Sequence, residues 1–175
     1  MMDDQQVVAL QLERPLRAAV EVVYRCPLGL PVVVAVPPLL DDGTPFPTRY
    51  WLSCPAARRR VGRIEAAGGV RAMDRRIRHD AAFAAAMGDT NRRYAAERDA
   101  LIPDGATPRP TGGVAGGSGG VKCLHAHYAD HRAGNTNPVG EFVAPWVEPF
   151  DCDVPCVIEG PDGVAAVNPG WSEPR

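Results

Sequence analysis

The stretch AVEVVYRCPLGLPVVVAV, residues 19–36, decides the fold class. Two β-branched runs, residues 19–26 and 31–36, flank the turn-like tetrapeptide PLGL, and such side chains fit the pleated surface of a strand. The pattern predicts a β-hairpin. A loop with several prolines follows, and then TRYWLSC, residues 48–54, is typical of a third short strand. The first third of the chain therefore predicts a small antiparallel sheet.

The hydrophobic period changes after Cys54. Pro55 suits the first position of a helix, and apolar residues then recur at helical spacing until the pair Gly68-Gly69. The same spacing resumes and continues to Pro103, which predicts one or two further helices. Shorter helices are expected over 5–13, over 121–134 and near Pro138, with a C-terminal hairpin around 160–163. The prediction is an α+β protein: several helices packed on a small antiparallel sheet.

The length of 175 residues fits a single domain. We expect its core to span about residues 7–157, with a flexible Pro/Gly-rich loop over 104–120 and a frayed tail over 168–175. The charged run TNRRYAAERD, residues 90–99, together with an i,i+4 pair of Asp89 and Arg93, indicates a solvated helix surface.

The charge balance disfavours some partners. Nineteen Lys and Arg against 21 Asp and Glu give a formal charge of −2, so no general field attracts nucleic acid or anionic lipid. The sequence has no apolar stretch of bilayer-spanning length and no secretory signal peptide, which predicts a cytoplasmic protein without a membrane partner. In a reducing compartment, clustered cysteines more often bind metal or do redox chemistry than form disulfides.

Cysteines at the ends of predicted elements suggest a metal site. Cys26 and Cys54 each end a predicted strand, and Cys123 falls in the first turn of a predicted helix, with His127 four residues later on the same face. These four residues make a Cys3His set for zinc, or hold an iron–sulfur cluster, with Cys156 as an alternative ligand. Cys152 and Cys156, spaced C-x3-C before the predicted hairpin, could supply ligands as well. The other interpretation is that the cysteines are reduced, partly buried side chains without a ligand.

A second pattern indicates an anion site. Gly119, Gly120 and Lys122, the single lysine of the chain, stand directly before the predicted helix, whose free N–H groups favour a phosphate or carboxylate. The spacing does not match a Walker A motif. Cys123 and His125 are the candidate catalytic residues beside it.

The motifs RCPLGLP, DDGTPFPTRYWLSCP, GGVKCLHAHYADH and NTNPVG, in this order, resemble the DUF501 family, found mainly in actinobacteria. The resemblance covers about residues 7–157 and implies a single domain without naming an activity. Within it, Cys26, Lys122, Cys123, His125 and Asn137-Pro138 match family positions, whereas the position of Cys54 is not always Cys.

Three functions are therefore open. The first is metal binding through Cys and His side chains. The second is an enzyme acting on a phosphorylated or nucleotide-like substrate, held by the glycine-rich loop and Lys122. The third is an interaction module linked to cell division, because relatives are often encoded beside a septum-formation initiator protein.

Overall fold

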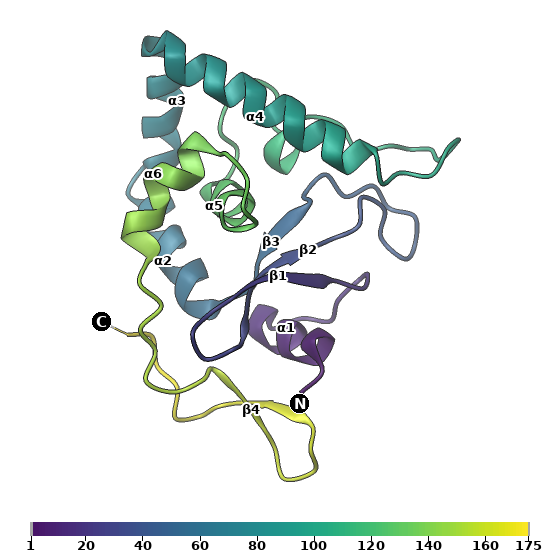
Figure 1. The fold of residues 1–175 in the computed structure, drawn as a ribbon, viewed down its shortest axis with the longest axis vertical. Coiled ribbons are helices and arrows are strands. Elements are labelled where there is room, and N and C mark those ends of the chain that lie inside the picture. Colours follow the sequence, from purple (N-terminus) through teal and green to yellow (C-terminus); the bar gives the residue numbers. More distant parts are fainter. Residues whose placement is uncertain (1, 175) are drawn as a thin grey trace.

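The computed structural model describes residues 2–174, and it has the predicted α+β architecture (Figure 1). Within this range no helix combines the length and apolar character needed to cross a membrane. The helices are α1 (Asp4–Leu12), α2 (Pro55–Ala66), α3 (Gly69–His79), α4 (Ala81–Asp99), α5 (Leu124–Arg132) and α6 (Pro138–Val147), with a 3-10 turn η1 (Val114–Gly116). The strands are β1 (Glu21–Arg25), β2 (Pro31–Ala35), β3 (Tyr50–Leu52), β4 (Val157–Glu159) and β5 (Ala165–Val167).

The main sheet is antiparallel in the order β1-β2-β3, so the predicted hairpin is confirmed. Its turn uses Gly29 at φ 79°, a backbone conformation that glycine adopts without strain. Strand β2 lies in the centre and is buried throughout. Val33 and its partner Leu52 face the helices, whereas Val34 packs toward α1 on the other face. The sheet therefore separates two apolar clusters.

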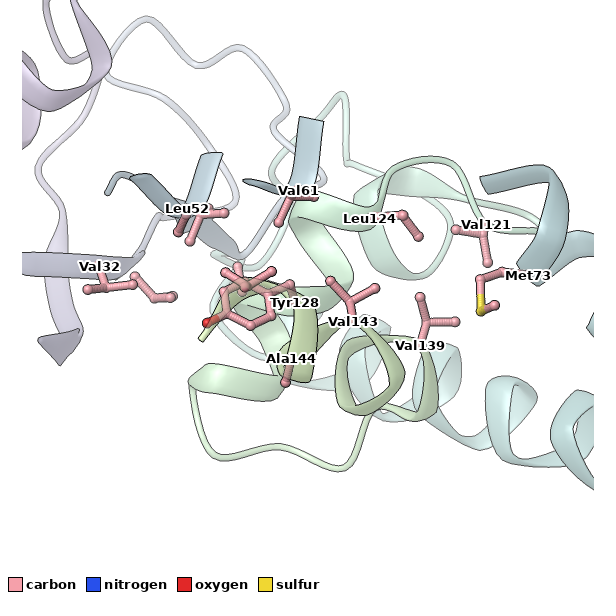
Figure 2. Packing of buried hydrophobic residues seen from close by; sticks show 14 of the residues in the cluster. Val32, Leu52, Val61, Met73, Val121, Leu124, Tyr128, Val139, Val143 and Ala144 are labelled. Atoms are coloured by element: carbon pink, nitrogen blue, oxygen red, sulfur yellow. The ribbon is translucent and has the colours of Figure 1, made fainter. Parts of the chain in front are cut away.

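Helix α5 occupies the middle of the larger cluster, between β3 and helix α6 (Figure 2). Leu124 and Tyr128 lie on it as 1% and 0% exposed side chains, and Val143 of α6 packs against them. Gly140 permits the close approach of the two helices, because a Cβ added there would lie 2.4 Å from the His127 carbonyl oxygen. A short loop between α5 and α6 thus joins two tightly packed neighbours.

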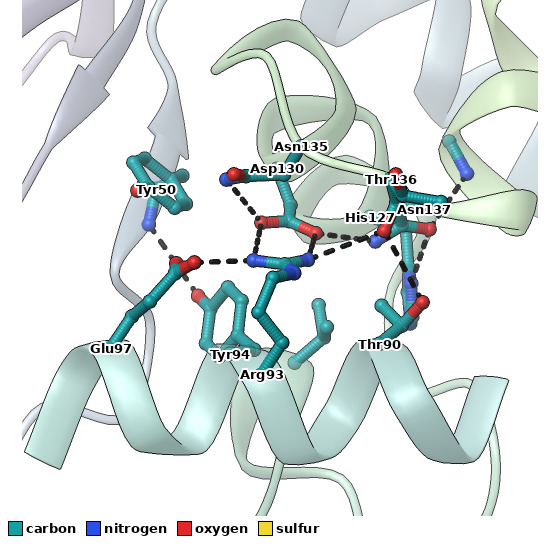
Figure 3. Close-up of polar contacts among 12 residues, drawn as sticks. Tyr50, Thr90, Arg93, Tyr94, Glu97, His127, Asp130, Asn135, Thr136 and Asn137 are labelled. Carbon is teal, nitrogen blue, oxygen red and sulfur yellow. Dashed lines mark hydrogen bonds and ion pairs between the residues drawn. The ribbon is translucent and has the colours of Figure 1, made fainter. Parts of the chain in front are cut away.

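A buried polar network fastens these helices to α4 (Figure 3). The Asp130 carboxylate is fully buried and accepts hydrogen bonds from Arg93 at 3.1 and 2.6 Å and from Asn137 at 2.8 Å. The Asn137 side-chain oxygen accepts in turn from Gly140 N–H, which caps α6. The prediction that Arg93 pairs with Asp89 on a solvated surface was wrong: Asp89 pairs with Arg92, and Arg93 turns inward to a buried charge.

Both segments expected to be loose make specific contacts. In the glycine-rich loop, Arg98 donates to the carbonyl oxygens of Thr111 and Gly112, and Val114 is buried in η1. In the tail, Glu173 pairs with Arg63 of α2 at 2.5 Å. The composition of these segments does not reveal that arginines elsewhere in the chain form hydrogen bonds and ion pairs with them.

Replacing Gly140 with Ala is expected to destabilise the protein by about 1–3 kcal/mol, because the new methyl group forces α5 and α6 apart. The matched control is Gly62→Ala in the interior of α2, where an added Cβ meets nothing within 4 Å and helix propensity predicts a gain of up to ~1 kcal/mol. Urea unfolding of both variants measures the difference. Equal stabilities would contradict the packing described for Gly140.

The stability of the protein is expected to fall as the pH drops below about 6.5, the ordinary value for His. Burial lowers the pKa of His127, so the unfolded chain takes up a proton before the folded chain does. The contribution of buried, neutral His127 to the free energy of unfolding is fully present above that pH. It is lost as the pH falls through the folded-state pKa of His127. Urea unfolding between pH 5 and 7 should show a flatter profile for His127→Asn, whose amide still donates to Asn137 but does not titrate. Parallel profiles would contradict this assignment.

Candidate functional site

The structure gathers three potential metal ligands where helix α2 ends and helix α5 begins. Glu65 lies in the last turn of α2, Cys123 directly precedes α5, and His125 lies in its first turn. One ligand atom from each residue lies within 4.8 Å of the other two, and this is the one such group of three or more among residues 2–174. All three residues are partly buried, so the group is shielded but reachable from solvent.

The start of α5 explains why His125, and not His127, joins Cys123. The prediction placed Cys123 inside the first helical turn, where the residue four positions later shares its face. The helix instead begins at Leu124, and Cys123 has extended backbone angles, φ −160° and ψ 125°. Helical spacing therefore does not apply from Cys123. His127 is 1% exposed and hydrogen-bonds through Nδ1 to Asn137 at 3.1 Å.

Glu65 fixes the geometry of the group by two contacts of one oxygen. Its Oε1 accepts from the Leu124 backbone N–H at 2.6 Å, which occupies a free donor at the start of α5. The same oxygen lies 3.2 Å from His125 Nδ1. The carboxylate thus links the two helices and orients the imidazole ring.

His125 is held between acceptors on both sides of its ring. Nε2 lies 3.1 Å from the Arg58 carbonyl oxygen, which can only accept, so Nε2 carries a proton. Burial favours the neutral ring, but the Cys123 sulfur and the Glu65 charge outweigh it and raise the pKa of His125 to about 9. In the metal-free chain this residue is therefore an imidazolium at neutral pH, and a metal would displace the proton on Nδ1.

The predicted set Cys26, Cys54, Cys123 and His127 is divided between three places. Cys26 and Cys54 do come together, because β1 and β3 are both antiparallel to β2 and end beside its first residues. Cys156 and Cys152 line the same pocket. Cys123 lies instead with Glu65 and His125, and His127 belongs to the buried polar network.

The loop expected to bind an anion already uses carboxylates of the protein. Asp74 of α3 accepts from the Val121 N–H at 2.8 Å, and a Cβ on Gly120 would lie 3.1 Å from the same oxygen. Gly119 has φ 94°, and Lys122 is exposed. Two donors near the helix start are thus occupied from within, by Asp74 and Glu65.

A hollow of about 200 Å³ adjoins His125. Arg58 and Arg59 line it together with Glu13 and Pro55. Sequence reasoning missed these arginines and Glu65, because each lies on an ordinary amphipathic helix and nothing in the local pattern marks it. Only the packing of α2 against α5 brings them to the site.

Comparison with known proteins identifies the family of the chain. Residues 22–145 match the family model described as Protein of unknown function (DUF501), a range that contains the whole group of Glu65, Cys123 and His125. A search of curated proteins and a search of solved structures found no match. Because the family model spans most of the chain, the protein belongs to the DUF501 family.

Proposed function

We propose that this protein binds a divalent metal ion of the zinc type through Glu65, Cys123 and His125. The observation that supports this most is the convergence of a carboxylate, a thiol and an imidazole within 4.8 Å. The hydrogen bond from His125 Nε2–H to a backbone carbonyl adds support, because metal-bound histidines usually donate their second N–H to such an acceptor. Three protein ligands with a fourth position left for water are typical of catalytic zinc sites.

The donor set favours a single zinc ion over an iron–sulfur cluster at this site. Iron–sulfur clusters are held mainly by several thiolates, and this group contains one thiol. Zinc accepts sulfur, nitrogen and carboxylate oxygen together in one tetrahedral shell. When bound, the ion would act as a Lewis acid toward a water or an oxygen of a substrate. His125, held by the Arg58 carbonyl, and Glu65, held by the Leu124 N–H, would keep the ligands oriented.

Replacing Glu65 with Gln is expected to weaken zinc binding by about 100-fold, because a charged ligand is lost while an oxygen remains to accept from Leu124 N–H. Cys123→Ser should have an effect of similar size. His131→Ala, on the same helix but outside the group, is the matched control and should bind as the unmodified protein does. Competition titrations with a zinc-sensitive chelator measure the affinities. Unchanged affinity in the first two variants would refute the site.

A second candidate function is an enzyme that acts on an anionic, phosphorylated substrate. Its support is the hollow lined by Arg58 and Arg59 beside His125, since guanidinium groups match phosphate oxygens in charge and geometry. Arg58 also donates to the Gln11 carbonyl at 2.9 Å, which fixes its position on the wall. We therefore propose the anion subsite on α2 and not on the glycine-rich loop.

Replacing Arg59 with Ala is expected to weaken binding of inorganic phosphate to the zinc-loaded protein by about tenfold, the loss of one charge-assisted hydrogen bond. The control is Arg75→Ala on helix α3, which removes an equally exposed charge away from the hollow. Isothermal titration calorimetry gives both affinities. If the two variants lose affinity equally, the effect is one of net charge and the subsite proposal fails.

A further inference from the structure

Four of the five cysteines line one small pocket below the sheet. Cys26 follows β1, Cys54 precedes α2, and Cys152 and Cys156 come from the irregular segment between α6 and β4. Each thiol lies within electrostatic range of another: Cys54 of Cys26 and Cys156, and Cys156 of Cys26 and Cys152. The pocket shares no residue with the group of Glu65, Cys123 and His125, so the two are distinct.

The pocket is built with hydrogen-bond donors that suit sulfur carrying negative charge. Gln11 Nε2 donates to the Cys156 sulfur at 3.6 Å. Trp171 also lines the pocket, and its buried Nε1–H has no acceptor among the described residues. These donors would stabilise metal-bound thiolates, as groups around a metal site commonly do.

An unpartnered acceptor on the wall points to a cation or its bound water. Gln11 is 2% exposed and lines the pocket. Its Nε2 donates to the Pro31 carbonyl at 2.9 Å, but its Oε1 is buried and lacks a hydrogen-bond partner within residues 2–174. A buried oxygen without a partner is destabilising, so a bound group that satisfies it would be stabilised.

The size of the pocket selects a single ion. Its volume of about 20 Å³ is close to that of one water molecule, which is too small for an iron–sulfur cluster. No three of the four sulfurs lie within 4.8 Å of one another, whereas a tetrahedral zinc shell with bonds of about 2.3 Å requires sulfurs roughly 3.8 Å apart. Binding must therefore bring the sulfurs closer together than they lie in the metal-free chain.

We infer that Cys26, Cys54, Cys152 and Cys156 form a second metal site, which takes up one thiophilic divalent ion of the zinc type. Each thiol that coordinates the ion releases its proton to solvent, and uptake is therefore favoured by rising pH. The ion ties the C-terminal segment to the sheet.

Cobalt(II) titration of the reduced, metal-stripped full chain tests the inference, because thiolate-to-cobalt charge-transfer absorbance grows with the number of sulfur ligands. The unmodified protein should bind two ions. Cys152→Ser and Cys156→Ser should each bind one ion tightly and lose most of the charge-transfer absorbance. Cys123→Ser should also bind one ion but keep most of that absorbance. Cys152 lies on irregular chain outside the buried core, so its serine variant tests the site even if Cys156→Ser misfolds.

The possible results of the cobalt titration distinguish the four-cysteine site from the proposed site at Glu65. If the unmodified chain binds one ion, and this ion is lost in Cys123→Ser but kept in Cys152→Ser, the inference is overturned and the Glu65 site stands. If the unmodified chain binds one ion, and only Cys152→Ser and Cys156→Ser lose it, the inference is supported and the proposed function is overturned. One ion that both kinds of variant lose, or no ion at all, would overturn the existence of a separate thiol site.

Discussion

The burial of helix α5 is the constraint on which the rest of the structure depends. Six of its nine residues are buried, among them the side chains of His127 and Asp130. Burying a polar group without a partner is destabilising, so each end of the helix benefits from a specific one. Glu65 accepts from the Leu124 N–H at its start, and Arg93 neutralises Asp130 near its end. Helices α2 and α4 are thereby placed on either side of α5, and the candidate metal group forms where α2 meets its start.

The elements themselves were largely predictable, because their signals are local. The Val-rich runs specified the hairpin, Pro55 stands at the first position of α2, and Gly68 with φ 93° separates α2 from α3. The candidate site was not predictable to the same degree. Helix α5 begins at Leu124, three residues after the predicted start at 121, and this changed the partner of Cys123 from His127 to His125. Element boundaries are the least certain part of a sequence-based assignment, and here a boundary decides the chemistry.

The positions of the cysteines show the same limit of sequence-based prediction. Sequence reasoning brought Cys26 and Cys54 together, because neighbouring strand ends meet at one edge of a sheet. It offered Cys152 and Cys156 as further ligands but could not locate them at this edge, since the path of the C-terminal segment depends on distant contacts. Arg60 of α2 donates to the carbonyl oxygens of Val147 and Pro149 at 2.8 and 2.7 Å. An arginine in an amphipathic pattern gives no sign that it will direct a segment almost ninety residues away.

Helix α2 sets the distance between the two candidate sites. Cys54 stands directly before its first residue and Glu65 one residue before its end, eleven positions apart. At a rise of 1.5 Å per residue the helix acts as a rigid spacer of about 16 Å between them. That separation exceeds the Debye length of about 8 Å at physiological salt, so charge added at one end is largely screened at the other. An ion could not pass directly from one set of ligands to the other. The two proposed sites would therefore fill independently, without transfer of an ion between them.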